Sequence, residues 1–192
     1  TLEAEAPAAS VMFRFLLPDD ALAALASGDI DLAIGQFRDC PDGMVRETLF
    51  QDRYVVVARA GHPVLREPLD LERFCQLPHL LSAPAGAQPG PFDRRLAELG
   101  LRRRVTVTAP RLLTAFALAG STDAVLVAPQ RQAEQHARAF GLEAGPLPAG
   151  VGDLPFDVSM VRLGGPISDP AVEWLAVRLC GALTGADMRA PN

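Results

Sequence analysis

Residues 21–35, ALAALASGDIDLAIG, constrain the fold of this chain more than any other stretch. Leu22 and Leu25 recur at helical spacing on one face, and Gly28 stands where a helix C-terminus favours a left-handed residue. Residues 32–34 are then apolar enough for a strand that is buried on both faces. A short helix, a turn and a buried strand in immediate succession predict an α/β fold.

The rest of the chain continues this alternation, which favours parallel strands joined by crossover helices. The predicted strands cover residues 11–16, 32–35, 45–50, 54–58, 80–82, 105–108, 124–127 and 156–163. After the first helix, the predicted helices cover residues 69–76, 92–99, 112–119 and 130–140, and a last one runs from Pro170 to Leu183.

Two segments interrupt this alternation of strands and helices, and each can carry the chain from one lobe to another. One lies near residues 59–63, and a glycine- and proline-rich one lies near residues 146–155. A chain that leaves one lobe, builds a second and returns forms two Rossmann-like lobes with mostly parallel sheets, joined by two crossover strands. We therefore expect lobe I to comprise residues 1–60 and 155–192, and lobe II residues 61–154. A ligand cleft is expected between them, at the carboxyl ends of the strands.

Composition limits the function. The chain has 192 residues, 49% of them hydrophobic, enough for one domain or two small lobes. Its net charge of -5 argues against binding a nucleic-acid backbone by itself. It contains no lysine, which excludes Schiff-base chemistry and a phosphate-loop lysine. Its three widely spaced cysteines fit reduced thiols in a cytoplasmic protein, and no apolar run reaches membrane-spanning length.

Four segments occur in an order that resembles one known family. They are LASGDIDLAIG, DRYVVVARAGHP, PHLLSAPAGAQPGPFDRRLAELGLRRRV and STDAVLVAPQRQAEQHARAFGLEAGPLP. Together they resemble the effector-binding half of LysR-type transcriptional regulators over residues 1–184, and the last is similar to a branch that often senses aromatic or phenolic compounds.

The resemblance implies a fold like that of type 2 periplasmic binding proteins, with a small organic effector, aromatic or a carboxylate, between the lobes and no cofactor. It also implies homodimers or tetramers, and contact with DNA through an N-terminal helix-turn-helix domain that is absent from this chain. The family's sensing domain begins with a strand and helix, and residues 1–6 resemble only the end of that helix. We therefore expect an N-terminally truncated first lobe.

Candidate effector contacts follow the strands at the expected cleft. Gln36 and Phe37 come directly after the strand of residues 32–35 and can hydrogen-bond and stack on an effector. The loop after residues 80–82 offers backbone N–H groups near a helix N-terminus, a setting that attracts carboxylates. Its candidate residues are Ser82, Ala83 and Gly86, and the second-lobe loop adds Thr108 and Ala109.

Other interpretations compete with this one. Residues 102–104, three arginines, are better explained as cations after a helix end than as a nucleic-acid patch. The histidines are scattered, so no metal site is expected. A periplasmic-type solute-binding protein of the same fold is the main alternative, a module that serves mainly to dimerise is another, and an enzyme is disfavoured because no catalytic motif is present.

Overall fold

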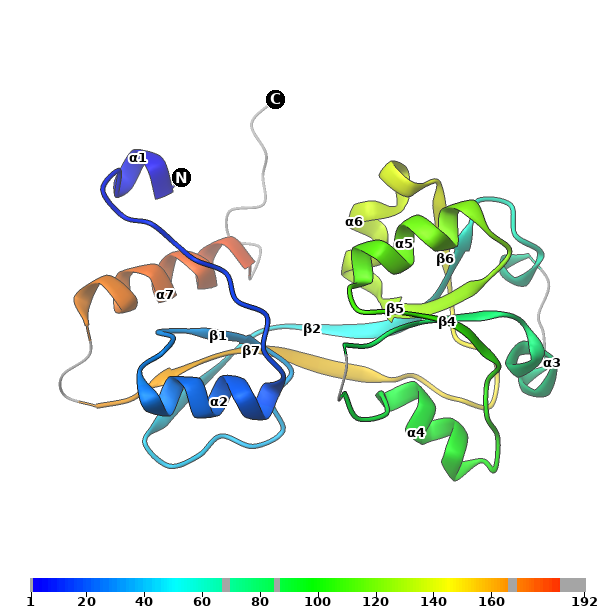
Figure 1. Ribbon diagram of the computed structural model, residues 1–192, viewed down its shortest axis with the longest axis horizontal. Coiled ribbons are helices and arrows are strands. Elements are labelled where there is room, and N and C mark those ends of the chain that lie inside the picture. The colour runs from blue at the N-terminus through cyan, green and yellow to red at the C-terminus, as the bar shows by residue number, and fades with distance from the viewer. Residues whose placement is uncertain (1, 67–69, 85–86, 166–168, 184–192) are drawn as a thin grey trace. The chain divides into compact units, whose positions relative to one another are not determined.

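The computed structural model describes residues 2–66, 70–84, 87–165 and 169–183. Contacts divide the chain into unit 1, Thr1–Glu47 with Ser159–Asn192, and unit 2, Thr48–Val158. Strands β2 (Met44–Arg59) and β7 (Pro155–Leu163) contribute residues to both units (Figure 1). The predicted α/β fold is confirmed, and the lobe boundaries predicted at residues 60 and 155 stay a prediction.

Unit 1 is built around the helix and strand predicted at residues 21–35. Helix α2 (Pro18–Ser27) ends at Gly28, whose φ of 78° is left-handed. The Gly28 N–H donates to the Leu25 carbonyl at 3.1 Å and the Asp29 N–H to the Ala24 carbonyl at 2.9 Å, which is a Schellman motif. Strand β1 (Ala33–Gly35) runs antiparallel to β7, and the remaining helices are α1 (Leu2–Glu5) and α7 (Pro170–Leu183).

Two predictions for unit 1 are wrong. Residues 11–16 form no strand, and Met12 and Phe13 are 86% and 89% exposed. The strand of residues 32–35 is not buried on both faces, because Ile34 is 44% exposed. In the described part of the chain β1 pairs only with β7, so the apolar run of residues 11–16 has no neighbouring strand to bond.

Unit 2 contains a mixed sheet. Strands β3 (His79–Ser82), β4 (Val105–Ala109) and β5 (Val125–Pro129) run parallel to one another, in the order β5-β3-β4. β2 and β6 (Leu142–Gly145) pair with each other antiparallel, and β2 also pairs antiparallel with β5. This corrects the prediction of mostly parallel sheets. The segments 45–50 and 54–58 belong to one continuous strand, β2, which runs antiparallel to β5. Strand β6 was not predicted.

Helices cover both faces of this sheet because its strands alternate apolar side chains between two cores (Figure 1). The helical segments described in unit 2 are η1 (Pro63–Leu65), α3 (Leu71–Gln76), α4 (Pro91–Glu98), α5 (Leu112–Ser121) and α6 (Gln130–Phe140). Val55 and Val57 belong to the core beneath α5 and α6, and Val56 and Ala58 to the core beneath α3 and α4.

Candidate ligand-binding site

Strands β3 and β4 bring the predicted residues of unit 2 together at their carboxyl ends. Ser82 is opposite Ala109 and Leu81 is opposite Thr108 in the parallel register. The pairing continues one residue into the loop, where the Ala83 N–H donates to the Ala109 carbonyl at 3.0 Å. The carboxyl edge of a parallel sheet is where α/β proteins hold ligands, so this edge is the candidate site.

The individual residues at this edge have different environments. Ser82 is half-buried and lines a pocket, and Thr108 is exposed on β4. The Ala109 side chain is only 3% exposed and packs in the core beneath α5, so only its backbone can face a ligand. The Ala83 N–H is already bonded to Ala109. Gly86 lies outside the described residues.

Gln36 and Phe37 belong to unit 1, where they directly follow β1. Gln36 is exposed, as expected of a contact residue. Phe37 is half-buried and packs against the core formed by α2, β1 and β7, and its carbonyl accepts a hydrogen bond from Arg46 Nη1 at 3.1 Å. Their predicted role toward an effector stays a prediction.

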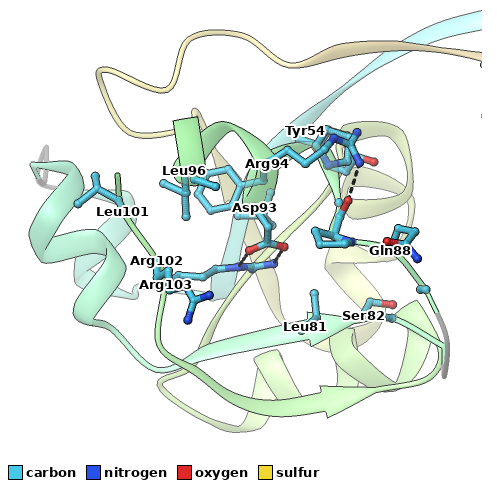
Figure 2. Close-up of a pocket in the computed structure, with 18 of the residues that line it drawn as sticks. Tyr54, Leu81, Ser82, Gln88, Asp93, Arg94, Leu96, Leu101, Arg102 and Arg103 are labelled. Carbon is cyan, nitrogen blue, oxygen red and sulfur yellow. Dashed lines mark hydrogen bonds and ion pairs between the residues drawn. The ribbon is translucent and has the colours of Figure 1, made fainter. Parts of the chain in front are cut away.

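A pocket of about 660 Å³ extends from this edge along α4 (Figure 2). Its wall includes Ser82 and Ala83 at the strand end, Tyr54 on β2, and the apolar side chains of Phe92, Leu96 and Leu101. Figure 2 shows the Asp93 carboxylate facing the Arg103 guanidinium, with Ser82 and Gln88 toward the other end of the pocket. The volume lies within the range of small-molecule sites.

An ion pair between Asp93 and Arg103 lies in the wall of this pocket. Arg103 Nε and Nη2 donate to the two Asp93 carboxylate oxygens at 2.7 and 2.8 Å, and the Arg103 side chain is 4% exposed. The Arg103 guanidinium carbon also lies 5.3 Å from the centre of the Phe92 ring. Two parallel hydrogen bonds fix the guanidinium plane, so Arg103 is a rigid part of the site.

Sequence reasoning missed this arginine because it treated residues 102–104 as one run of cations. In the structure Arg103 is buried, and Arg104 is held by its Nε, which donates to the Gln76 carbonyl at 3.0 Å. The available signal was local. Asp93 in the first turn of α4 precedes the helix end at Gly100, and the chain then reverses to bring Arg103 back beside it.

His79, the first residue of β3, is a structural histidine that contacts α3. It is fully buried, and its Nε2 carries the hydrogen, because its partner at 2.9 Å is the Phe74 carbonyl, which can only accept. Burial lowers the pKa of His79 from 6.5 to about 4, and the Arg103 charge adds to this, while the bond to Phe74 opposes it. His79 is therefore neutral near pH 7.

Two other kinds of feature, a metal-binding cluster of side chains and a membrane-spanning helix, are absent from the described part of the chain. In residues 2–66, 70–84, 87–165 and 169–183, no group of three or more His, Cys, Asp or Glu side chains is placed to hold a metal ion. No helix within those ranges has the length and apolarity needed to cross a bilayer.

Comparison with known proteins identifies the family. Residues 1–180 match the sequence model of the LysR substrate binding domain, so the chain belongs to that family. It is 36% identical over 125 residues to the HTH-type transcriptional activator NahR of Pseudomonas putida, an alignment that covers 65% of this chain and 42% of NahR. It is 32% identical over 167 residues to the HTH-type transcriptional regulator SyrM of Rhizobium meliloti, covering 86% of this chain and 51% of SyrM.

A solved structure agrees with the fold. The regulatory domain of MexT, a transcriptional activator in Pseudomonas aeruginosa, has a TM-score of 0.77 and 28% identity, covering 93% of this chain and 87% of the MexT chain. The chain spans about half the length of the curated relatives that it matches, or somewhat less. The chain is thus a LysR effector-binding domain. Because its relatives are transcriptional regulators, the alternative of a periplasmic-type solute-binding protein is not favoured.

Proposed function

We propose that this domain senses a small organic molecule that binds at the carboxyl ends of β3 and β4 in unit 2. The observation that carries the proposal is the register that sets Ser82 beside Ala109 and ties Ala83 to the Ala109 carbonyl. That contact holds two strand-end loops together at the sheet edge where α/β folds bind ligands. The pocket that includes Ser82 and Ala83 supplies the volume.

The ligand acts by differential affinity. A molecule that binds one conformation of the domain more tightly than another shifts the population toward the first, by no more than the difference in binding free energy. In the whole regulator this shift would change how an N-terminal helix-turn-helix domain binds its operator, in a cytoplasmic homodimer or tetramer. The names of the relatives, HTH-type activators and regulators, support the attached helix-turn-helix domain.

The domain has no catalytic role in this proposal. Its relatives are regulators, and the polar side chains at the strand ends, Ser82 and Thr108, form no hydrogen bond to a histidine or acidic side chain in the described part of the chain that would activate a nucleophile. In this proposal the domain releases a bound molecule without having changed it chemically.

Binding is tested by calorimetry and thermal shift against a panel of small aromatic and aliphatic acids. Ser82→Ala and Thr108→Val are expected to weaken binding of a panel member roughly fivefold each, the loss of one hydrogen bond. Ser121→Ala, at the C-terminal end of α5 and the amino end of the sheet, is the matched control and should bind as the unaltered chain does. A panel member that binds equally well to all three variants would place the site elsewhere.

A further inference from the structure

The pocket along α4 combines an apolar wall with positive charge. Phe92 and Leu96 are buried on the inner face of α4, and Leu101 follows the helix. The whole chain carries a net charge of -5, yet the charged residues that line this pocket are mostly cations. Such a surface favours an amphipathic anion. The charged lining residues are Arg94, Arg102, Arg103 and Asp93.

Arg103 lines this pocket and has a donor without a partner in the described part of the chain. Its Nε and Nη2 are both bonded to Asp93, but Nη1 is buried and has no hydrogen-bond partner among the residues that the structure describes. The side chain is 4% exposed, so it is largely shielded from solvent. A buried donor left without a partner is costly, and a charged one more so. An acceptor supplied by a ligand would remove that cost.

We propose that this pocket binds a small organic anion, with a carboxylate accepting from Arg103 Nη1 and an apolar body packed on Phe92, Leu96 and Leu101. The inference rests on the proposed function in that the pocket shares Ser82 and Ala83 with the strand-end site. It goes further by naming the residue that anchors the carboxylate and the side chains that hold the apolar body. That residue lies before β4, outside the loops that the sequence indicated.

Asp93 allows a discriminating test, because its carboxylate stabilises the fold by pairing with Arg103 but repels an anionic ligand. Its carboxylate occupies two donors of Arg103 and repels a second anion. If the ion pair served only to hold the pocket in shape, neutralising Asp93 would weaken ligand binding, because the pocket would lose that support. An anion pocket would instead bind more tightly, since the substitution Asp93→Asn removes the repulsion between the carboxylate and the ligand and releases a donor of Arg103.

The test uses benzoate as the probe and benzamide as its neutral isostere, measured by calorimetry on the full chain. We expect benzoate to bind and benzamide to bind roughly tenfold more weakly or not at all. Arg103→Met should weaken benzoate at least roughly tenfold, whereas Asp93→Asn should strengthen it several-fold. Arg138→Met, which removes the same charge from the exposed surface of α6, is the matched control and should leave binding unchanged.

A second readout places the anion. In arginine-labelled protein, benzoate should shift the Nε–H resonance of Arg103, which is held by Asp93, and shift that of Arg73, an arginine on α3 outside the pocket, far less. Unchanged benzoate affinity in Arg103→Met would overturn the inference while leaving a ligand site at the strand ends intact. Should that variant not fold, equal or weaker binding in Asp93→Asn would overturn it.

The two proposals fail separately. No benzoate binding at about 10 mM by the unaltered chain would also reject the anion pocket. Binding of another panel member that depends on Ser82 and Thr108 but not on Arg103 would then still support the strand-end site.

Discussion

Asp52 on β2 caps the first turn of α6 through the backbone of Arg131. Its two carboxylate oxygens accept the Arg131 N–H at 3.4 and 3.3 Å, and Oδ1 also accepts the N–H of Arg53 at 2.8 Å. Helix α6 begins after Pro129, which offers no side-chain cap, so a carboxylate from another strand satisfies an orphan donor of the first turn. The Arg131 guanidinium lies 4.0 Å from the centre of the Phe50 ring, which ties the same turn to β2 a second time.

Asp52→Ala should therefore lower the free energy of unfolding by about 1–2 kcal/mol, the usual cost of removing a helix cap. Urea denaturation followed by circular dichroism measures the change. Asp153→Ala removes an exposed aspartate from the turn before β7 and should change stability by less than about 0.5 kcal/mol. Equal effects of the two substitutions would show that the capping contact contributes nothing.

His79 makes stability depend on pH in the acidic range. Burial holds its pKa in the folded state near 4, below the ordinary value of 6.5 that it regains on unfolding. Between these values the unfolded chain binds a proton that the folded chain does not, so stability falls as the pH is lowered from about 6.5 to about 4. The loss attributable to this residue is at most about 3 kcal/mol. His79→Gln should flatten the curve of unfolding free energy against pH in this window, and a curve parallel to that of the unaltered chain would contradict the assignment.

Local signals made part of the fold predictable. Gly28 follows an apolar helical face and precedes an apolar strand, and its left-handed conformation is required by the two hydrogen bonds that close α2. Such a helix end is encoded within a few residues. Residues 11–16 carry an equally good local pattern, yet no strand forms there, since strand formation depends on a partner that local sequence does not supply.

The candidate site was also only partly predictable from local sequence. The position of Ser82 and Thr108 at the ends of β3 and β4 was predictable, because the ends of buried strands can be read from apolar runs and topology places them at one edge. The burial of Arg103 was not predictable, because it depends on the tertiary contact that brings Asp93 of α4 within hydrogen-bond distance. Charge runs read from sequence do not reveal which member of the run turns inward.

The Asp93–Arg103 pair should also show itself in stability. Arg103→Met leaves the half-buried Asp93 carboxylate without its partner and should lower the free energy of unfolding by about 2 kcal/mol. The double variant Asp93→Leu with Arg103→Met removes both charges and should cost less than the sum of the single substitutions. Urea denaturation of the four proteins gives the coupling energy. Additive effects would mean that the two side chains do not interact.

Gly120 is fixed by a close approach rather than by its backbone angles. A Cβ at this position of α5 would clash with the Phe140 carbonyl oxygen at the end of α6, far inside van der Waals contact. Alanine is the better helix former, by about 1 kcal/mol, so helix propensity alone predicts that Gly120→Ala stabilises. We expect the opposite, a loss of about 2–3 kcal/mol, because the two helices must separate to admit the methyl group.

Gly181 in α7 provides the matched comparison, since a Cβ there would meet no atom within 4 Å. Gly181→Ala should follow propensity and raise the free energy of unfolding by up to about 1 kcal/mol. Thermal and urea unfolding of both variants should therefore move in opposite directions. If Gly120→Ala were as stable as the unaltered chain, α5 and α6 would have to pack less closely than the structure places them, and the core that holds Phe116 beneath the sheet would be looser as well.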